Sequence, residues 1–374
     1  MKLTPEEFSH IPRHAVPHVV RRISALGIGQ KMQDLPVSLW HESFKKYVND
    51  ETRKGGPNLR LFRLDPDQPS LTVTGFIFNK FVHPFEPRFI SPREAARLQG
   101  FPDSYLFKGC RTSVQRQVGN AVPTQLARAV AGVILQHIVN HHPRGLGTSV
   151  YKDGVFPAIS MFSGAGGLDI GVSGAKHKDS GFHFSTQVDI EIDHDCCETL
   201  RFNNKGKNLQ VIEKSITACD MLEVKKGCHL QRGILPLVYG GPPCQAFSQA
   251  GKQKATDDPR GELIFSYLDA IDKLKPVYFI LENVANLRGI CEGKLFKSIL
   301  KRIDDMNYSA VPALLNAADY GAPQKRKRIV LIGVQKPFPS VQPPFPTHGE
   351  GIGQKPFVTV REAFAGLPPA PKWP

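Results

Sequence analysis

The stretch AISMFSGAGGLDIG, residues 158–171, carries a short apolar strand into a glycine turn and then into a helix. Glycine lets a ligand approach the backbone closely, because it has no side chain in the way. The first turn of the following helix offers N–H groups that no residue of the helix uses. The stretch therefore predicts a ligand site where this strand ends, although a glycine turn alone does not identify the ligand.

Strands and helices alternate from this stretch to about residue 340. We predict strands at 158–162, 184–192, 235–239, 277–281 and 329–334, and a helix at 262–274. Such alternation predicts an α/β fold with a doubly wound, mostly parallel sheet. Ligands of these sheets bind at the carboxyl ends of the strands. The loops SGAGG (163–167), GGPPC (240–244) and EN (282–283) all fall there.

The first part of the sequence has a different texture. Residues 1–90 contain scattered prolines and show poor periodicity, so we predict a small, loop-rich domain with β-like pieces at 70–74 and 76–78. A helix is expected at 92–106, ended by Gly100 and Pro102, and a longer one at 124–141. Residues 141–157 are rich in glycine and proline and are typical of a linker.

Composition limits the class of protein. The 374 residues have a net charge of +14, which favours a polyanionic partner. No apolar run approaches the roughly 20 residues of a membrane span, and the start lacks the apolar stretch of a signal peptide. Seven cysteines without a repeated spacing indicate reduced thiols and no metal site. We expect a soluble, intracellular monomer.

Three groups of side chains could carry chemistry. Cys244 follows two glycines and two prolines in VYGGPPCQAFS (238–248), so it is either a stiffly aimed nucleophile or the end of a tight turn. Glu191 and Asp193 follow a strand, where an acid binds ribose or is simply solvated. Glu282 ends an apolar strand and is either an active-site acid or a surface residue.

Residues 321–333 read GAPQKRKRIVLIG and enter the last predicted strand. Alternation along a strand directs Gln324, Arg326 and Arg328 to one face. The alternative is a basic surface patch, for which Lys325 and Lys327 on the other face are equally suited.

Taken together, these stretches resemble the DNA cytosine-5 methyltransferase family over nearly the whole sequence. FSGAGG resembles the S-adenosylmethionine loop of the family, GGPPCQAFS its nucleophile loop, ENV (282–284) its acid motif and QKRKR its QxRxR motif. REAARLQGFP (93–102) and QVGNAVP (117–123) resemble its last two motifs. Six motifs in suitable contexts make this resemblance highly specific.

The resemblance implies a mechanism and a double-stranded DNA substrate. Cys244 would attack C6 of cytosine, Glu282 would protonate or hydrogen-bond N3, and C5 would then take a methyl group from S-adenosylmethionine. Arg326 and Arg328 would supply positive charge beside the activated base. Because a stacked base hides C6, the target cytosine would have to be flipped out of the duplex.

The resemblance also implies binding residues. Those for the cofactor would be Phe162, Ser163, Gly164, Ala165, Gly166, Gly167, Leu168, Glu191, Ile192, Pro242, Asn120, Ala121 and Val122. Those for DNA would be Gln245, Ser248, Arg260, Asn283 and Gln324. In the expected recognition region, Arg53, Lys54, Arg60, Arg63 and Lys80 are candidates to read bases, with contact to phosphate or solvent alone as the alternative.

The order of the motifs departs from the family. The recognition region and the last two motifs usually come last, and here they come first, so we expect a circular permutation. The expected parts are a recognition domain (1–90), the transposed motifs (91–140), a linker (141–157), a catalytic domain (158–340) and a connection packed on the recognition domain (341–374). A family acid near the adenine is also displaced, with Ser215 or a shifted Asp220 in its place.

Other classes explain the sequence less well. A tRNA cytosine-5 methyltransferase would lack a sizeable recognition region, and a catalytically inactive DNA-binding regulator would be expected to lose Cys244, Glu282 or the glycine loop. A nicotinamide enzyme is disfavoured because GAGGLD lacks the GxGxxG spacing. We therefore expect a cytoplasmic enzyme, associated with the nucleoid when bound to DNA, which a cognate restriction endonuclease can accompany.

Overall fold

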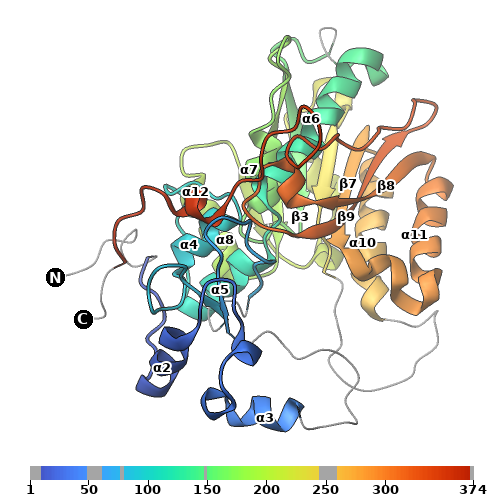
Figure 1. Cartoon of the computed structure of the whole chain (residues 1–374). Coiled ribbons are helices and arrows are strands. Elements are labelled where there is room, and N and C mark those ends of the chain that lie inside the picture. The colour runs from blue at the N-terminus through green and yellow to red at the C-terminus, as the bar shows by residue number, and fades with distance from the viewer. Residues whose placement is uncertain (1–9, 49–60, 76–79, 147–149, 244–258, 371–374) are drawn as a thin grey trace.

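The computed structural model describes residues 10–48, 61–75, 80–146, 150–243 and 259–370, and within them a seven-stranded sheet forms the centre (Figure 1). Its strand order is β5-β4-β3-β6-β7-β9-β8. The bounds are β3 (Val155–Met161), β4 (His183–Glu191), β5 (Gln210–Glu213), β6 (Leu237–Gly240), β7 (Tyr278–Val284), β8 (Tyr308–Asn316) and β9 (Lys327–Gln335). The strand order runs outward from β3 on one side and from β6 on the other, so the topological switch point lies between these two strands.

The sheet is mostly parallel, as the sequence predicts. Strands β3 to β7 pair in parallel, whereas β9 pairs antiparallel with both β7 and β8. Every residue of β6 is buried, and so are six of the seven residues of β7. Central strands covered on both faces read as continuous apolar runs, which is why the sequence identified them.

Helices cover both faces of this sheet. The helices beyond residue 120 are α6 (Thr124–His141), α7 (Gly167–Ser173), α8 (His194–Asn203), α9 (Met221–Lys226), α10 (Pro259–Leu274), α11 (Lys294–Asp305) and α12 (Val360–Phe364). Helices α6 and α7 share one hydrophobic core with the sheet. Helices α9, α10 and α11 share a second core on the opposite face. The fold is therefore a three-layer α/β sandwich (Figure 1).

The N-terminal part is more helical than the sequence indicated. It contains α2 (Pro17–Ala25), α3 (Glu42–Val48), α4 (Pro92–Leu98) and α5 (Arg111–Asn120), with two short parallel strands, β1 (Phe62–Arg63) and β2 (Phe81–Val82). The expected piece at 70–74 contributes only an isolated bridge from Ser70 to Gln324, and the piece at 76–78 lies outside the described residues. The helix expected at 92–106 ends at Leu98, before Gly100, whose φ is +83°.

Segments from the two ends of the sequence meet on the small N-terminal part. Helix α12 lies against α4, and Val360 belongs to the same buried cluster as Leu64 and Leu98. The imidazole of His10 is 2.8 Å from the carbonyl oxygen of Pro368. Residues near both ends of the described part are therefore in direct contact.

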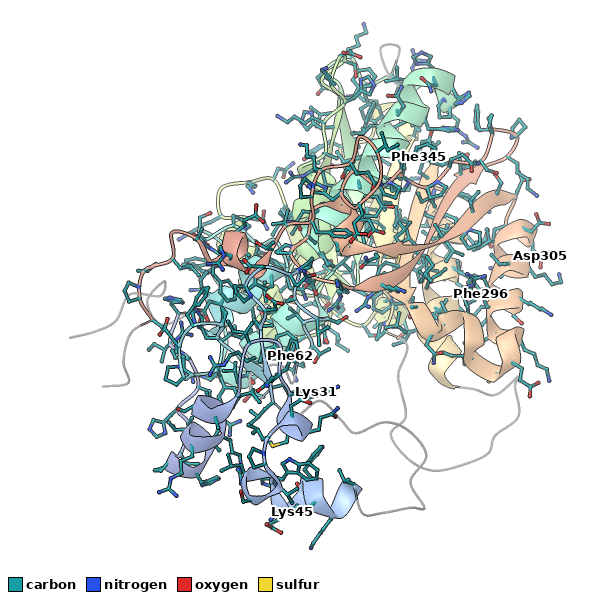
Figure 2. The ribbon with its side chains drawn as sticks, in the orientation of Figure 1. Lys31, Lys45, Phe62, Phe296, Asp305 and Phe345 are labelled. Atoms are coloured by element: carbon teal, nitrogen blue, oxygen red, sulfur yellow. The ribbon has the colours of Figure 1, made fainter. Side chains whose placement is uncertain are left out.

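The small N-terminal part, which contains α2 and α3, and helix α11 lie at opposite sides of the molecule. Lys31 and Lys45 mark the N-terminal helical part, and Asp305 ends α11 beyond the sheet (Figure 2). None of the helices that the structure describes has the length and apolar character to cross a membrane.

Candidate active site

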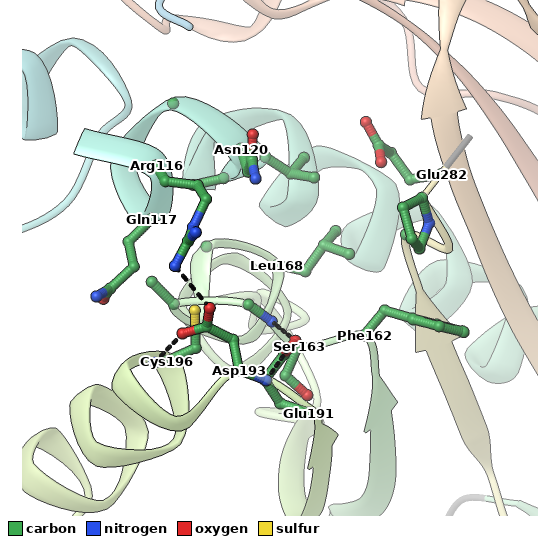
Figure 3. A pocket seen from close by; sticks show the side chains of 18 of the residues that line it. Arg116, Gln117, Asn120, Phe162, Ser163, Leu168, Glu191, Asp193, Cys196 and Glu282 are labelled. Atoms are coloured by element: carbon green, nitrogen blue, oxygen red, sulfur yellow. Dashed lines mark hydrogen bonds and ion pairs between the residues drawn. The ribbon is translucent and has the colours of Figure 1, made fainter. Parts of the chain in front are cut away.

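A cavity of about 620 Å³ opens at the carboxyl ends of β3, β4, β6 and β7, beside the topological switch point. Residues of the small part, on α5 and just after it, close its other side (Figure 3). The predicted site residues that line it are Phe162, Ser163, Gly164, Ala165, Gly167, Leu168, Glu191, Ile192, Pro242, Asn120, Ala121, Val122, Glu282, Asn283, Arg326 and Arg328. Segments far apart in the sequence thus form one site.

The glycine loop adopts a shape that only particular residues allow. Gly166 has a φ of +79°, a left-handed conformation that favours glycine. A Cβ at Gly167 would lie 2.6 Å from the carbonyl oxygen of Val122, so the loop and the QVGNAVP segment touch backbone to backbone. The N-terminal part of the protein therefore packs directly against this loop.

Glu191 holds this loop from the next strand. One carboxylate oxygen accepts the N–H of Gly164 at 2.7 Å, and the other accepts the N–H groups of Ile192 and Asp193 at 2.9 and 2.8 Å. Each carboxylate oxygen has more than one lone pair, so the acid keeps capacity to accept hydrogen bonds from ligand hydroxyls. These contacts orient the acid toward the cavity.

The residues at the end of the cavity near Glu191 fit an adenosyl group. Ile192 lines the cavity and yet is 69% exposed, which leaves an apolar surface for a flat ring. No described atom lies within 4 Å of a Cβ built on Gly164, so the backbone there is open to a ligand. Together with the carboxylate of Glu191, these groups match a nucleoside: an apolar wall for the base and an acceptor for the ribose.

Glu282 lies across the cavity from Glu191 and Asp193 (Figure 3). It is buried, and burial raises the pKa of its carboxyl, while the charges of Arg328 and Arg326 act in the opposite direction. The Nε of Arg328 lies 2.9 Å from its Oε1. The carboxyl therefore takes up a proton more readily than an exposed glutamate would, and a fixed cation stands beside it.

Arg326 is fixed by the backbone of the small part. Its guanidinium donates to the carbonyl oxygens of Val73 and Gly119. Burial lowers the pKa of Arg326 to about 9. Arg326, Arg328 and Glu282 therefore form a cluster of two cations and one acid at one end of the cavity.

Two polar residues expected to contact DNA have structural roles instead. Gln324 is fully buried; its amide accepts the N–H of Val73 and donates to the Leu98 carbonyl and the Gln99 side chain. Arg63 is also buried and donates to several backbone carbonyls, those of Ile23, Leu26 and His83 at 2.7 Å each. Neither side chain is free to reach DNA, because each holds separate segments together.

Several predicted residues fall outside the part that the structure describes. They are Cys244, Gln245, Ser248, Arg53, Lys54 and Arg60, together with the side chain of Arg260. Pro243, which directly precedes Cys244, lines the cavity.

Lys80 is half-buried beside β2. Asn283 is buried and engaged by backbone groups, so its amide is not available for the DNA contact that the resemblance implied.

The cavity also has lining residues that the sequence did not single out. Arg116 of α5 forms an ion pair of 2.8 Å with Asp193, which caps α8 through Cys196. Thr74 and Gly75 come from the poorly patterned region, where no local signal marked them. Ser215 and Asp220 cap a 3-10 helix and α9, and neither lines the cavity.

A doubly wound sheet with a glycine loop, an acid placed for ribose and a buried acid in one cavity is consistent with an S-adenosylmethionine-dependent methyltransferase. The family model for the C-5 cytosine-specific DNA methylase matches residues 21–136 and 156–358. The protein belongs to this family, and S-adenosylmethionine is its methyl donor.

Individual relatives agree with this family. The type II methyltransferase M.AquIA of Picosynechococcus sp. is 38% identical, and the match covers 57% of this chain and 89% of that relative. M.XorII of Xanthomonas oryzae and M1.HphI of Haemophilus parahaemolyticus are each 35% identical over 58% and 56% of this chain. The chain spans about half the length of these last two relatives, 47% and 52%.

Proposed function

We propose that this protein methylates C5 of cytosine within a specific sequence of double-stranded DNA, with Cys244 as the nucleophile. The observation that supports this most is the shared cavity: Glu282, Arg326 and Arg328 face the glycine loop, and Pro243 leads directly from the cavity wall to Cys244. This reaction requires an acid, a nucleophile and a cofactor pocket; the acid and the pocket share this cavity, and the nucleophile follows Pro243 in the sequence.

The bond changes follow from these residues. The Cys244 thiolate forms a bond to C6, the C5–C6 electron pair moves toward C5, and Glu282 gives its proton to N3. S-adenosylmethionine supplies the methyl group that C5 then accepts. Glu282 takes the proton back from N3, the C5 proton passes to solvent, and departure of the Cys244 thiolate restores the aromatic ring, with S-adenosylhomocysteine as the other product. The raised pKa of Glu282 favours its proton-donating form, and Arg328 stabilises the carboxylate left behind.

The base must reach this cavity from a duplex. Glu282 is buried at the end of β7, so a cytosine stacked in DNA cannot contact it. We therefore propose that the target cytosine is flipped into the cavity. Because the related proteins are named type II methyltransferases, we further propose that the protein modifies the site of a restriction–modification system in the cytoplasm.

Trapping with 5-fluorocytosine tests the reaction. Fluorine at C5 blocks the last elimination, so the enzyme should remain covalently attached to mixed-sequence DNA when S-adenosylmethionine is present. We expect an adduct on a denaturing gel with the native protein and none with Cys244→Ser. No adduct on several genomic DNAs, with cofactor binding verified, would contradict the proposal; an adduct on tRNA alone would move the activity to RNA.

A further inference from the structure

The side chain of Asn283 links the strand that carries the acid to the loop that leads to the nucleophile. It is 3% exposed at the end of β7, directly after Glu282. Its Nδ2 donates to the carbonyl oxygen of Pro242 at 2.9 Å, and its Oδ1 accepts the N–H of Val284 at 2.8 Å. Both functional groups of the amide are therefore used for backbone contacts.

The loop at Pro242 and Pro243 has few other backbone groups that could hold it in place. Pro242 and Pro243 have no N–H, so this part of the loop cannot donate a backbone hydrogen bond. The contact from Asn283 therefore fastens the loop through the one backbone group that Pro242 has left, its carbonyl oxygen. Cys244 is the second residue after that carbonyl.

The same strand end also sets the place of the acid. A Cβ on Gly241 would lie 2.8 Å from Oε2 of Glu282, so the loop passes directly over the carboxyl. Two neighbouring residues of β7 thus contact the loop, one through its carboxyl and the other through its amide. A shift of the loop would move Pro242 and Pro243, which lead to Cys244 in the sequence, relative to the acid.

We propose that Asn283 is a positioning residue that sets Cys244 against Glu282 for attack on C6. This inference rests on the proposed function of Cys244 and Glu282. It assigns Asn283 no contact with the base, the DNA or the cofactor. Its contribution is the geometry of bond formation, where a misplacement of about 1 Å can cost a reaction roughly 100-fold in rate.

An aspartate at this position removes the hydrogen bond to Pro242 while keeping the size of the side chain, so it separates the two effects. Asn283→Asp has nearly the same size and still accepts the Val284 N–H, but as a carboxylate it presents an oxygen to the Pro242 carbonyl. Two acceptors repel, so the loop should move. A protonated aspartic acid donates to that carbonyl as the amide does, whereas Asn283→Ala cannot at any pH.

The test measures adduct formation in a single turnover on 5-fluorocytosine DNA, with S-adenosylmethionine affinity and DNA affinity measured separately. We expect both variants to form the adduct roughly 10- to 100-fold more slowly, with both affinities within about threefold of the native values. The rate of Asn283→Asp, divided by the native rate, should rise as the pH falls, and that of Asn283→Ala should stay flat. Asn286→Asp is the matched control, because Asn286 is exposed three residues further along.

Each other result would overturn the inference. A native adduct rate in Asn283→Asp would show that the Pro242 contact does not matter. Loss of cofactor affinity in both variants would make Asn283 a support of the fold, and loss of DNA affinity alone would make it a DNA contact. Absence of an adduct with the native protein would instead contradict the proposed function, so the two failures are distinguishable.

Discussion

Asp169 of α7, which is half-buried, and Asp189 of β4, which is buried, have interacting carboxyl groups. Asp189 is 1% exposed, and one oxygen of each carboxyl has no hydrogen-bond partner among the described residues. The hydroxyl of Tyr239 donates to Asp169 at 2.7 Å. Burial is the main cause that raises the pKa of both, and the charge of Asp169 raises that of Asp189 further. We infer that the pair shares a proton.

Stability should therefore fall as the pH rises. A raised pKa in the folded state means that the folded protein holds a proton that the unfolded one releases near pH 4. The stabilising effect is complete at low pH and is lost as the pH rises through the raised pKa, by up to about 1.4 kcal/mol per pH unit. Asp189→Asn keeps a donor without ionising, so its melting temperature should fall less steeply than the native value as the pH rises above about 4.

The matched comparison is Asp179→Asn, a change on an exposed carboxyl. Its melting temperature should follow the native curve at every pH. Parallel curves for Asp189→Asn and the native protein from about pH 4 upward would contradict a raised pKa in the folded pair.

For single residues, the sequence predicts a role correctly when that role is set by the neighbouring residues in the sequence. Glu191 and the glycine loop face one cavity because a short local pattern sets each of them. The buried contacts of Arg63 and Gln324 could not be predicted because their partners lie far away in the sequence: Val73 is 251 positions from Gln324. A cation or an amide in a basic stretch looks the same in sequence whether it meets DNA or a backbone carbonyl.

Elements buried on both faces were predictable, whereas those at the edges were not. The apolar runs of β6 and β7 stand out, and α6 has the bounds that its apolar stripe indicates. Strand β5 is short and only half-buried, and β8 contains Pro312, which is tolerated because β8 is an edge strand. Tertiary pairing, rather than local pattern, creates such strands.

The crossing of α6 and α7 depends on one glycine. A Cβ on Gly171 would lie 2.4 Å from the Cβ of Ala127 and from the carbonyl oxygen of Thr124. Gly171→Ala should therefore push the two helices apart and destabilise the fold by about 1–3 kcal/mol, as overpacking does. Chemical denaturation gives the free energy of unfolding.

Gly132→Ala provides the opposite case on α6 itself. No described atom lies within 4 Å of a Cβ at Gly132, so alanine fits there and should stabilise the helix by up to about 1 kcal/mol. If both alanines stabilised the protein, helix propensity rather than helix contact would decide the outcome at Gly171.

The whole molecule joins the two blocks that the family model matches, 21–136 and 156–358, through a segment outside both. Both blocks line one cavity, and α6 from the first shares a core with β3 from the second. Residues near the two ends of the sequence meet at His10 and Pro368. These contacts support our proposal that the protein is a circular permutation, with a recognition part at 1–90 and a catalytic part at 158–340.

Such a molecule should work when it is cut in the connecting segment. Cleavage after Gly147 keeps the buried residues Pro143 and Leu146 with α6. Fragments 1–147 and 148–374 should then associate by burying the apolar face of α6 against the sheet. We expect the co-expressed fragments to copurify and to form the 5-fluorocytosine adduct.

The interface between the fragments provides the control. The hydroxyl of Tyr105 donates to the carbonyl oxygen of Ala165 in the glycine loop, and Gln117 accepts from Thr199. Fragment 148–374 alone lacks these contacts and the Asn120–Val122 wall, so it should bind S-adenosylmethionine far more weakly than the pair. Copurified fragments that bind the cofactor but give no adduct would show that a continuous segment between α6 and β3 is required for catalysis. That result would contradict the prediction that this segment only bridges two neighbouring ends.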